Sequence, residues 1–195
     1  MKHAIYDFET LGQNPKKSAV LSFAVVSYDD KDFLKGKGLD YDQLIANSHY
    51  IKFDVADQVK NYGREIDPNT LEWWKSQGET AKKVLKPSAD DKPISVFRSW
   101  LINALDWEPE EYERVYTRGN TFDPIFLAEL GADPFPWWSI RDTRSYIDAL
   151  LLGSTGVDNR FVPPEYKDKF VHHDPRHDIV MDIMRMQELP RAILL

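Results

Sequence analysis

The sequence contains no cysteine among its 195 residues, which excludes disulfide bonds and thiolate-ligated metal sites. It also lacks any apolar run of the roughly 18 residues that a membrane-spanning helix needs. Near the N-terminus a carboxylate already appears at Asp7, too early for the apolar segment of a signal peptide. These absences favour a cytoplasmic protein without a membrane segment, and the length fits one domain over residues 1–195.

A surplus of positive charge is missing as well. The chain has 25 Lys and Arg against 32 Asp and Glu, which gives a formal net charge of -7. Proteins that hold long nucleic acids are usually basic, because counterion release supplies much of their affinity. An acidic chain can still bind a short end when metal ions neutralise the phosphates. The charge therefore disfavours a binder of long tracts and leaves open an enzyme that trims ends.

Hydrophobic periodicity predicts an α/β chain. Strands are expected at 2–7, 19–28, 48–53 and 114–117, and helices at about 70–75, 94–105, 123–130, 143–152 and 177–188. Strands near the start followed by alternating helices and strands are typical of a layered α/β structure. The sequence contains no evident internal repeat or interdomain linker.

Two acidic residues, Asp7 and Glu9, end the first expected strand. Side chains alternate along a strand, so these two point to the same face. Adjacent carboxylates repel each other unless a cation lies between them, and their oxygen atoms suit Mg²⁺ or Mn²⁺ better than zinc. A solvated pair on an exposed strand is the alternative, but the apolar residues 4–6 indicate that the strand is buried.

Two further acidic residues lie later in the chain. Asp123 follows Phe122 where the strand at 114–117 leads into a helix. A side chain there points into the crevice at the carboxyl edge of the sheet, although an Asp in this place is more often a helix N-cap. Asp182 follows His177 by five residues on the last expected helix. These two lie about 140° apart around the helix axis, so they reach one site only if the start of the helix lies beside it.

In this order, these residues resemble the motifs of the DnaQ-like, or DEDDh, family of 3′-5′ exonucleases in the ribonuclease-H-like superfamily. The resemblance extends over residues 4–182, and the stretch 7–12 (DFETLG) is similar to the first family motif almost letter for letter. The stretch 70–77 (TLEWWKSQ) is similar to a branch with a phage exodeoxyribonuclease and bacterial exoribonucleases. One departure is Gly119, which stands where the family often has Asn; here Asn120 follows it.

The resemblance implies a ribonuclease-H-like fold, with a five-stranded mixed sheet in the order 3-2-1-4-5 and helices on both faces. It also implies that two Mg²⁺ or Mn²⁺ ions are held by Asp7, Glu9, Asp123 and Asp182. His177 is the expected general base, since an unperturbed histidine has a pKa of about 6.5. The expected reaction releases nucleoside 5′-monophosphates from 3′ ends of single-stranded DNA or RNA, with DNA slightly favoured. The enzyme is expected to be a monomer or homodimer.

Substrate contacts are expected from residues around the first motif and from aromatic side chains. These residues are Phe8, Thr10, Leu11, Trp73, Trp74 and Phe122. Adjacent tryptophans on a helix cannot share one face, so at least one of the pair is expected in the core. Packing beneath the first loop is the alternative for the first-motif residues. Arg118, Lys16 and Lys17 are weaker candidates for phosphate contacts, because single basic side chains are usually solvated.

Other classes of function remain as alternatives. A nuclease-like protein that only binds nucleic acid would normally lack one of the carboxylates or the histidine. An endonuclease on the same fold would cut a circular single strand. A zinc site of His172, His173 and His177 is disfavoured, because Asp174-Pro175 makes a continuous helix there unfavourable and cysteine is absent.

Overall fold

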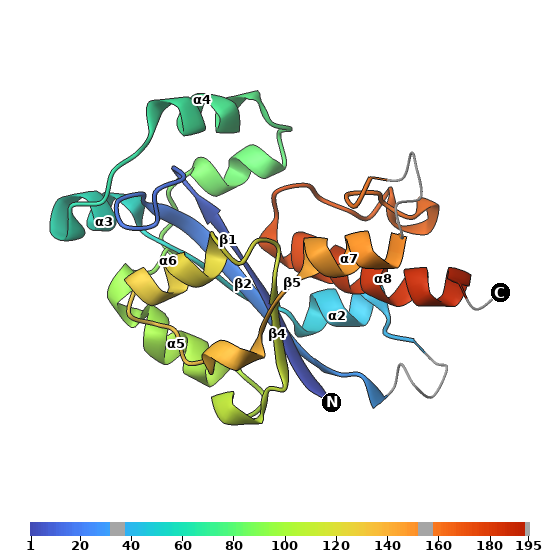
Figure 1. The fold of residues 1–195 in the computed structure, drawn as a ribbon. Coiled ribbons are helices and arrows are strands. Elements are labelled where there is room, and N and C mark those ends of the chain that lie inside the picture. Colours follow the sequence, from blue (N-terminus) through green and yellow to red (C-terminus); the bar gives the residue numbers. More distant parts are fainter. Residues whose placement is uncertain (32–37, 152–157, 194–195) are drawn as a thin grey trace.

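The fold is built on one five-stranded mixed sheet (Figure 1). The computed structural model describes residues 1–31, 38–151 and 158–193. The strands lie in the order β3-β2-β1-β4-β5, and β4 and β5 are parallel to β1 whereas β2 is antiparallel to both β1 and β3. The predicted sheet and strand order are confirmed. The strands are Lys2–Thr10 (β1), Val20–Asp29 (β2), His49–Lys52 (β3), Arg114–Thr117 (β4) and Ile140–Asp142 (β5).

Helices cover both faces of the sheet. In Figure 1, α5 and α6 lie on one side, α2, α7 and α8 lie on the other, and α4 lies beyond the carboxyl end of β1. Within the described ranges, no helix is long and apolar enough to cross a membrane. The helices are Tyr41–Asn47 (α2), Val55–Tyr62 (α3), Pro68–Ser76 (α4), Phe97–Ala104 (α5), Asp123–Glu129 (α6), Thr143–Leu151 (α7) and Pro175–Ile193 (α8).

Short 3-10 turns connect several of these elements, and one predicted helix runs past a described range. The turns are Ala81–Leu85, Ile94–Val96, Pro109–Glu111, Trp137–Ser139 and Pro164–Tyr166. The helix expected at 143–152 corresponds to α7, and residue 152 lies outside the described residues.

Side chains alternate along β1, so successive residues of this strand point to opposite faces of the sheet. Tyr6 and Phe8 belong to the apolar cluster that includes residues of α5 and α6. Ile5 belongs to the cluster that includes residues of α2, α7 and α8. Asp7 and Glu9 follow Ile5 on the same face, because side chains two residues apart share a face. The two carboxylates are therefore directed toward the face that α8 covers.

The last helix differs from its predicted bounds at both ends. It begins at Pro175 rather than at about His177, and proline suits the first helical position because its missing N–H has no intrahelical partner there. It also continues to Ile193, although Pro190 was expected to end it. The earlier start places Asp178 in the first turn of α8.

The loop after β1 is held tightly by neighbouring backbone. The Leu11 N–H donates to the Ala19 carbonyl at 2.8 Å, and the Asp67 N–H donates to the Leu11 carbonyl at 2.8 Å. At Gly12 a Cβ atom would collide with the Ser18 side chain. Glycine is therefore a steric requirement, and the loop is fixed beside the carboxyl end of β1.

The side chain of Gln58 extends the hydrogen bonding of the sheet at the start of β2. Gln58 is fully buried, and its amide accepts from the Val20 N–H at 2.9 Å and donates to the Val20 carbonyl at 2.8 Å. Gln58→Ala would leave both backbone groups buried without partners, so we expect the free energy of unfolding to fall by about 2–4 kcal/mol.

Urea denaturation measures this loss, with Val59→Ala as the matched control because Val59 is exposed on the same helix. Equal unfolding midpoints for the two variants would contradict the assigned role of Gln58.

Candidate active site

Four carboxylates converge at the carboxyl end of β1. Asp7 and Glu9 come from β1, Asp123 is the first residue of α6, and Asp178 lies in the first turn of α8. The charges of Asp123, Glu9 and Asp178 all act on Asp7. The Phe8 N–H donates to Oδ1 of Asp123 at 3.2 Å, which ties the start of α6 to β1. Strand alternation and two helix starts thus bring residues that are far apart in sequence to one edge of the sheet.

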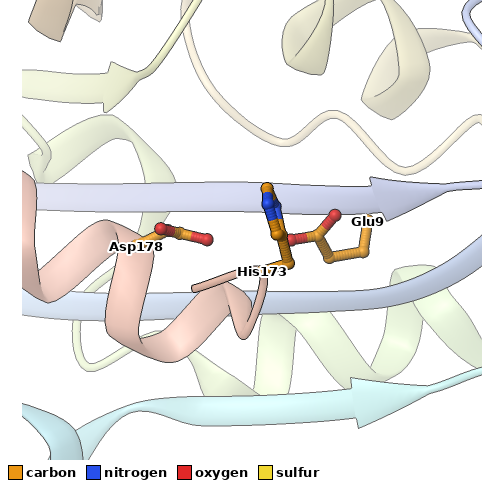
Figure 2. Close-up of side chains that lie close together, drawn as sticks. All are labelled: Glu9, His173 and Asp178. Atoms are coloured by element: carbon orange, nitrogen blue, oxygen red, sulfur yellow. The ribbon is translucent and has the colours of Figure 1, made fainter. Parts of the chain in front are cut away.

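Within this site, Glu9, His173 and Asp178 form a close group. Each residue offers one potential ligand atom, and these atoms all lie within 4.8 Å of one another. Figure 2 shows Glu9 on β1, Asp178 on the first turn of α8, and the His173 ring between them. The sequence predicts Glu9 at this site, but its motifs point to His177 and Asp182 rather than to His173 and Asp178.

The carboxyl groups of the site have raised pKa values. Burial raises the pKa of Asp123 to about 7 and the pKa of Asp178 to about 7. Burial also raises the pKa values of Asp7 and Glu9 well above the ordinary range. Repulsion from Asp123 adds most to the shift of Asp7, and repulsion from Asp178 adds most to that of Glu9. The ionised site therefore carries an excess of negative charge that a bound cation would offset.

The donor atoms fit the divalent metal dependence that the exonuclease family implies. Carboxylate oxygens from several elements are the ligands that Mg²⁺ and Mn²⁺ prefer. The chain has no cysteine, and a single imidazole among the carboxylates is a poor zinc set. The site is therefore suited to a hard divalent cation.

His173 lies just before α8 in an unusual backbone conformation. Its φ is 60°, in the left-handed region that non-glycine residues rarely occupy. The ring contacts Trp73 and Trp74 edge-on, with centroid distances of 4.8 and 5.8 Å. Burial lowers the pKa of His173, and the neighbouring His172 lowers it further. The imidazole is therefore mostly neutral at pH 7 and can accept a proton.

His177 and Asp182 lie outside the group of Glu9, His173 and Asp178, although Asp182 lines a small cavity with Asp7 and Asp178. Nδ1 of His177 lies 2.8 Å from the Tyr41 hydroxyl, at hydrogen-bonding distance. Asp182 is 1% exposed, and its Oδ1 accepts from Arg118 and Arg185, both at 2.6 Å. Two guanidinium groups thus neutralise Asp182, and Arg118 is engaged in this ion pair rather than exposed for a phosphate. The expected general base and fourth ligand therefore do not join the group around Glu9.

Near the start of α8 the His-x4-Asp spacing occurs twice, at 173–178 and at 177–182. The two copies are offset by four residues, which is about one helical turn. The signal that distinguishes them is Pro175, because proline favours the first helical position. A helix that starts there has Asp178 in its first turn and His173 immediately before it.

A cleft of about 540 Å³ opens beside Glu9, between the loop after β1, α4 and Phe122. Trp73 is 44% exposed, whereas Trp74 is fully buried and its Nε1–H donates to the Thr10 carbonyl at 2.9 Å. The predicted division of the tryptophan pair between surface and core is confirmed. Expected substrate contacts that line the cleft are Phe8, Thr10, Trp73, Trp74 and Phe122.

Leu11 is the expected substrate contact that does not line this cleft. Its side chain is 3% exposed and packs in an apolar cluster with Trp74 beneath the loop. Leu11 therefore packs beneath the first loop, which was the alternative to a substrate contact.

Sequence relatives of the chain are nucleases. The model of the 3′-5′ exoribonuclease Rv2179c-like domain family matches residues 2–179. The exodeoxyribonuclease of Enterobacteria phage T4 is 32% identical over 205 residues, which cover 94% of this chain and 86% of that protein.

Solved structures of exonuclease I share the fold. One, described as suggesting how exonuclease I achieves processivity, gives a TM-score of 0.62 at 14% identity and covers 99% of this chain and 43% of that chain. E. coli exonuclease I in complex with a dT13 oligonucleotide gives a TM-score of 0.56 at 12% identity, over 98% of this chain and 40% of that one. This chain thus spans less than half of those chains, and the likeness shows a ribonuclease-H-like fold.

The family match covers nearly the whole sheet and reaches the first turn of α8, so it includes every carboxylate that the structure brings together. The T4 relative extends the similarity over almost the full length. The chain therefore belongs to the Rv2179c-like family of 3′-5′ exoribonuclease domains and is a 3′-5′ exonuclease.

Proposed function

We propose that this exonuclease removes nucleoside 5′-monophosphates from the 3′ ends of single-stranded nucleic acid with the help of two Mg²⁺ or Mn²⁺ ions. The observation that carries the proposal is the convergence of two buried and two half-buried carboxylates and of His173 beside a cleft of about 540 Å³. A volume of this size suits a terminal nucleotide, and the carboxylates suit the cations that offset the charge of its phosphate.

The proposed ligands are Asp7, Glu9, Asp123 and Asp178. Asp178 replaces Asp182, because Asp182 is already neutralised by two arginines. When bound, the ions supply Lewis-acid stabilisation of charge at the scissile phosphate. The protein fixes the ligand positions itself, since the Phe8 N–H orients Asp123 and strand β1 holds Asp7 and Glu9 on one face.

His173 is the proposed general base in place of His177. It lies within 4.8 Å of Glu9 and Asp178, and its lowered pKa keeps the ring neutral at pH 7. Its edge-on contacts with Trp73 and Trp74 restrict where the ring can point. The neutral imidazole would accept the proton of the attacking water while the bond to the 3′ oxygen breaks.

The terminal nucleotide would occupy the cleft with its base against exposed aromatic surface. Trp73 on α4 and Phe122 just before α6 both line the cleft. Stacking on an aromatic ring tolerates any base, so it gives binding without sequence preference. This arrangement suits an enzyme that removes successive nucleotides.

Single-stranded DNA is the substrate that we favour. The support is the 32% identity to a phage exodeoxyribonuclease over nearly the whole chain. RNA is the second candidate, because the matched family is described as exoribonuclease. The two differ at the 2′-hydroxyl, so contacts to the sugar decide between them.

A gel assay with 5′-labelled single-stranded DNA and RNA oligonucleotides tests this function. We expect a ladder that shortens from the 3′ end with Mg²⁺ or Mn²⁺, and no ladder with EDTA. Asp7→Ala should lower the rate at least about 100-fold, because it removes one of the proposed metal ligands. Oligonucleotides that stay intact under every metal would reject the enzyme. A faster RNA ladder would replace DNA by RNA as the substrate.

A pair of histidine variants distinguishes the two possible general bases. We expect His173→Ala to lower kcat by about 10²–10⁴-fold, as loss of a general base usually does, and to remove the acid limb of the pH profile. His177→Ala should stay within about threefold of the wild-type kcat, because His177 contacts Tyr41 rather than the carboxylates. The reverse order of effects would return the role to His177.

Metal binding should stabilise the fold in a pH-dependent way. The pKa values of Asp123 and Asp178 are about 7 in the folded protein, above the roughly 3.9 of an unfolded Asp. The folded state therefore binds more protons, and metal-free stability falls as the pH rises from about 4 through 7. We expect saturating Mg²⁺ to raise Tm by roughly 5–10 °C at pH 8 and by less at pH 5.

Scanning calorimetry with and without EDTA measures the shift. Asp178→Asn removes one of the repelling charges, so it should raise the metal-free Tm at pH 8 and reduce the gain from Mg²⁺. A wild-type Tm that does not respond to saturating Mg²⁺ or Mn²⁺ at pH 8 would argue against a cation site at these residues.

A further inference from the structure

Arg144 is an exposed cation at the edge of the active site. It lies in the first turn of α7, at the carboxyl end of β5. Its charge acts on Asp123, which places the guanidinium within electrostatic reach of the carboxylates. Within residues 1–31, 38–151 and 158–193, Arg144 forms no ion pair. Its charge is therefore available to an external anion.

The guanidinium of Arg144 lies beside the backbone of Gly119. Gly119 has a φ of 142°, which side-chain-bearing residues rarely adopt. The Nη2, Cζ and Nη1 atoms of Arg144 lie 3.8, 3.9 and 4.0 Å from the position that a Cβ would take on Gly119. These are ordinary contact distances, so the guanidinium lies against the turn that precedes Asp123.

Three other arginines close to the site are already neutralised. Arg118 and Arg185 pair with Asp182, and Arg176 pairs with Asp174 at 2.6 Å. Arg144 differs from them because it is exposed and has no such partner in the described part of the chain. The protein has a net charge of -7. An arginine without an ion-pair partner beside the proposed cleavage site is therefore a candidate for binding a substrate phosphate.

The turn at residues 119–122 connects the cleft to Arg144. The Phe122 N–H donates to the Gly119 carbonyl at 2.9 Å, which closes the turn. One end of the turn, Phe122, lines the cleft that would hold the terminal nucleotide. The other end, Gly119, lies against Arg144. A strand with its last nucleotide in the cleft and its scissile phosphate at the carboxylates can therefore continue along the turn to Arg144.

Resting on the proposed function, we propose that Arg144 binds the phosphate immediately 5′ of the scissile one. A guanidinium can donate two parallel hydrogen bonds to one phosphate, which fixes the direction of the strand as well as holding it. The contact positions the substrate and takes no part in bond breaking. It makes cleavage depend on a charge one nucleotide upstream of the 3′-terminal linkage.

A substrate with one neutral linkage tests this contact. In a 5′-labelled oligodeoxynucleotide, the penultimate phosphate is replaced by methylphosphonate, and removal of the terminal nucleotide is followed. We expect wild-type kcat/KM to fall about tenfold with this substrate, as loss of one charged contact predicts. Arg144→Ala should lose about tenfold on the all-phosphate strand, mainly through KM, and then respond less than about twofold to the methylphosphonate.

Two controls keep the result specific. Arg141→Ala removes another exposed arginine, whose guanidinium donates to the Trp138 and Ile140 carbonyls, and it should keep the wild-type response. A Lys83→Ala/Lys86→Ala double variant tests the rival path along a second groove, which both lysines line next to His173. A full methylphosphonate response in Arg144→Ala, or its loss in the lysine variant instead, would overturn the proposal. Failure of the wild type to shorten the all-phosphate strand would instead reject the proposed function.

Discussion

The mutual repulsion of four carboxylates at the end of β1 is the constraint on which the site depends. Burial raises the pKa of each, and each adds to the cost of ionising its neighbours. Apolar clusters pack on both faces of β1 and offset this cost. One cluster includes residues of α5 and α6, and the other includes residues of α2, α7 and α8. Rigid packing thus holds these like charges close together at one edge of the sheet.

Two acidic residues one turn apart on α8 differ in whether the protein neutralises their charge. Asp182 receives two guanidinium groups, and the Thr143 hydroxyl also donates to it, so its charge is satisfied inside the protein. Asp178, one turn earlier, faces Glu9 and Asp7 and is left with a raised pKa. The arginine-paired residue anchors the helix behind the site, which fixes the direction in which the unpaired residue points. The charge that the protein neutralises and the charge that it leaves unpaired are therefore separated by a single helical turn.

The approach to the carboxylates is shaped by aromatic and strained residues. His173 is held in the left-handed region before α8, where its ring lies against Trp73 and Trp74. Such strain persists only where the surroundings fix it, and it is typical of functional sites. The buried Trp74, anchored to the Thr10 carbonyl, links α4 to the loop after β1. The same contacts that place the histidine therefore also form a wall of the cleft.

The sequence by itself determined the α/β class, and its motifs identified Asp7, Glu9 and Asp123. Strand alternation is a local property, so the shared face of Asp7 and Glu9 could be predicted without a fold. The short strand β5 and the helices α2 and α3 were not predicted, because their brief apolar patterns carry little periodic signal. Only the tertiary structure chose between the two His-x4-Asp pairs. Both have the same spacing, so the choice depends on where α8 starts and on which carboxylate is neutralised by Arg118, after β4, and Arg185 of α8. Packing between distant segments sets both, and spacing along the chain does not encode it.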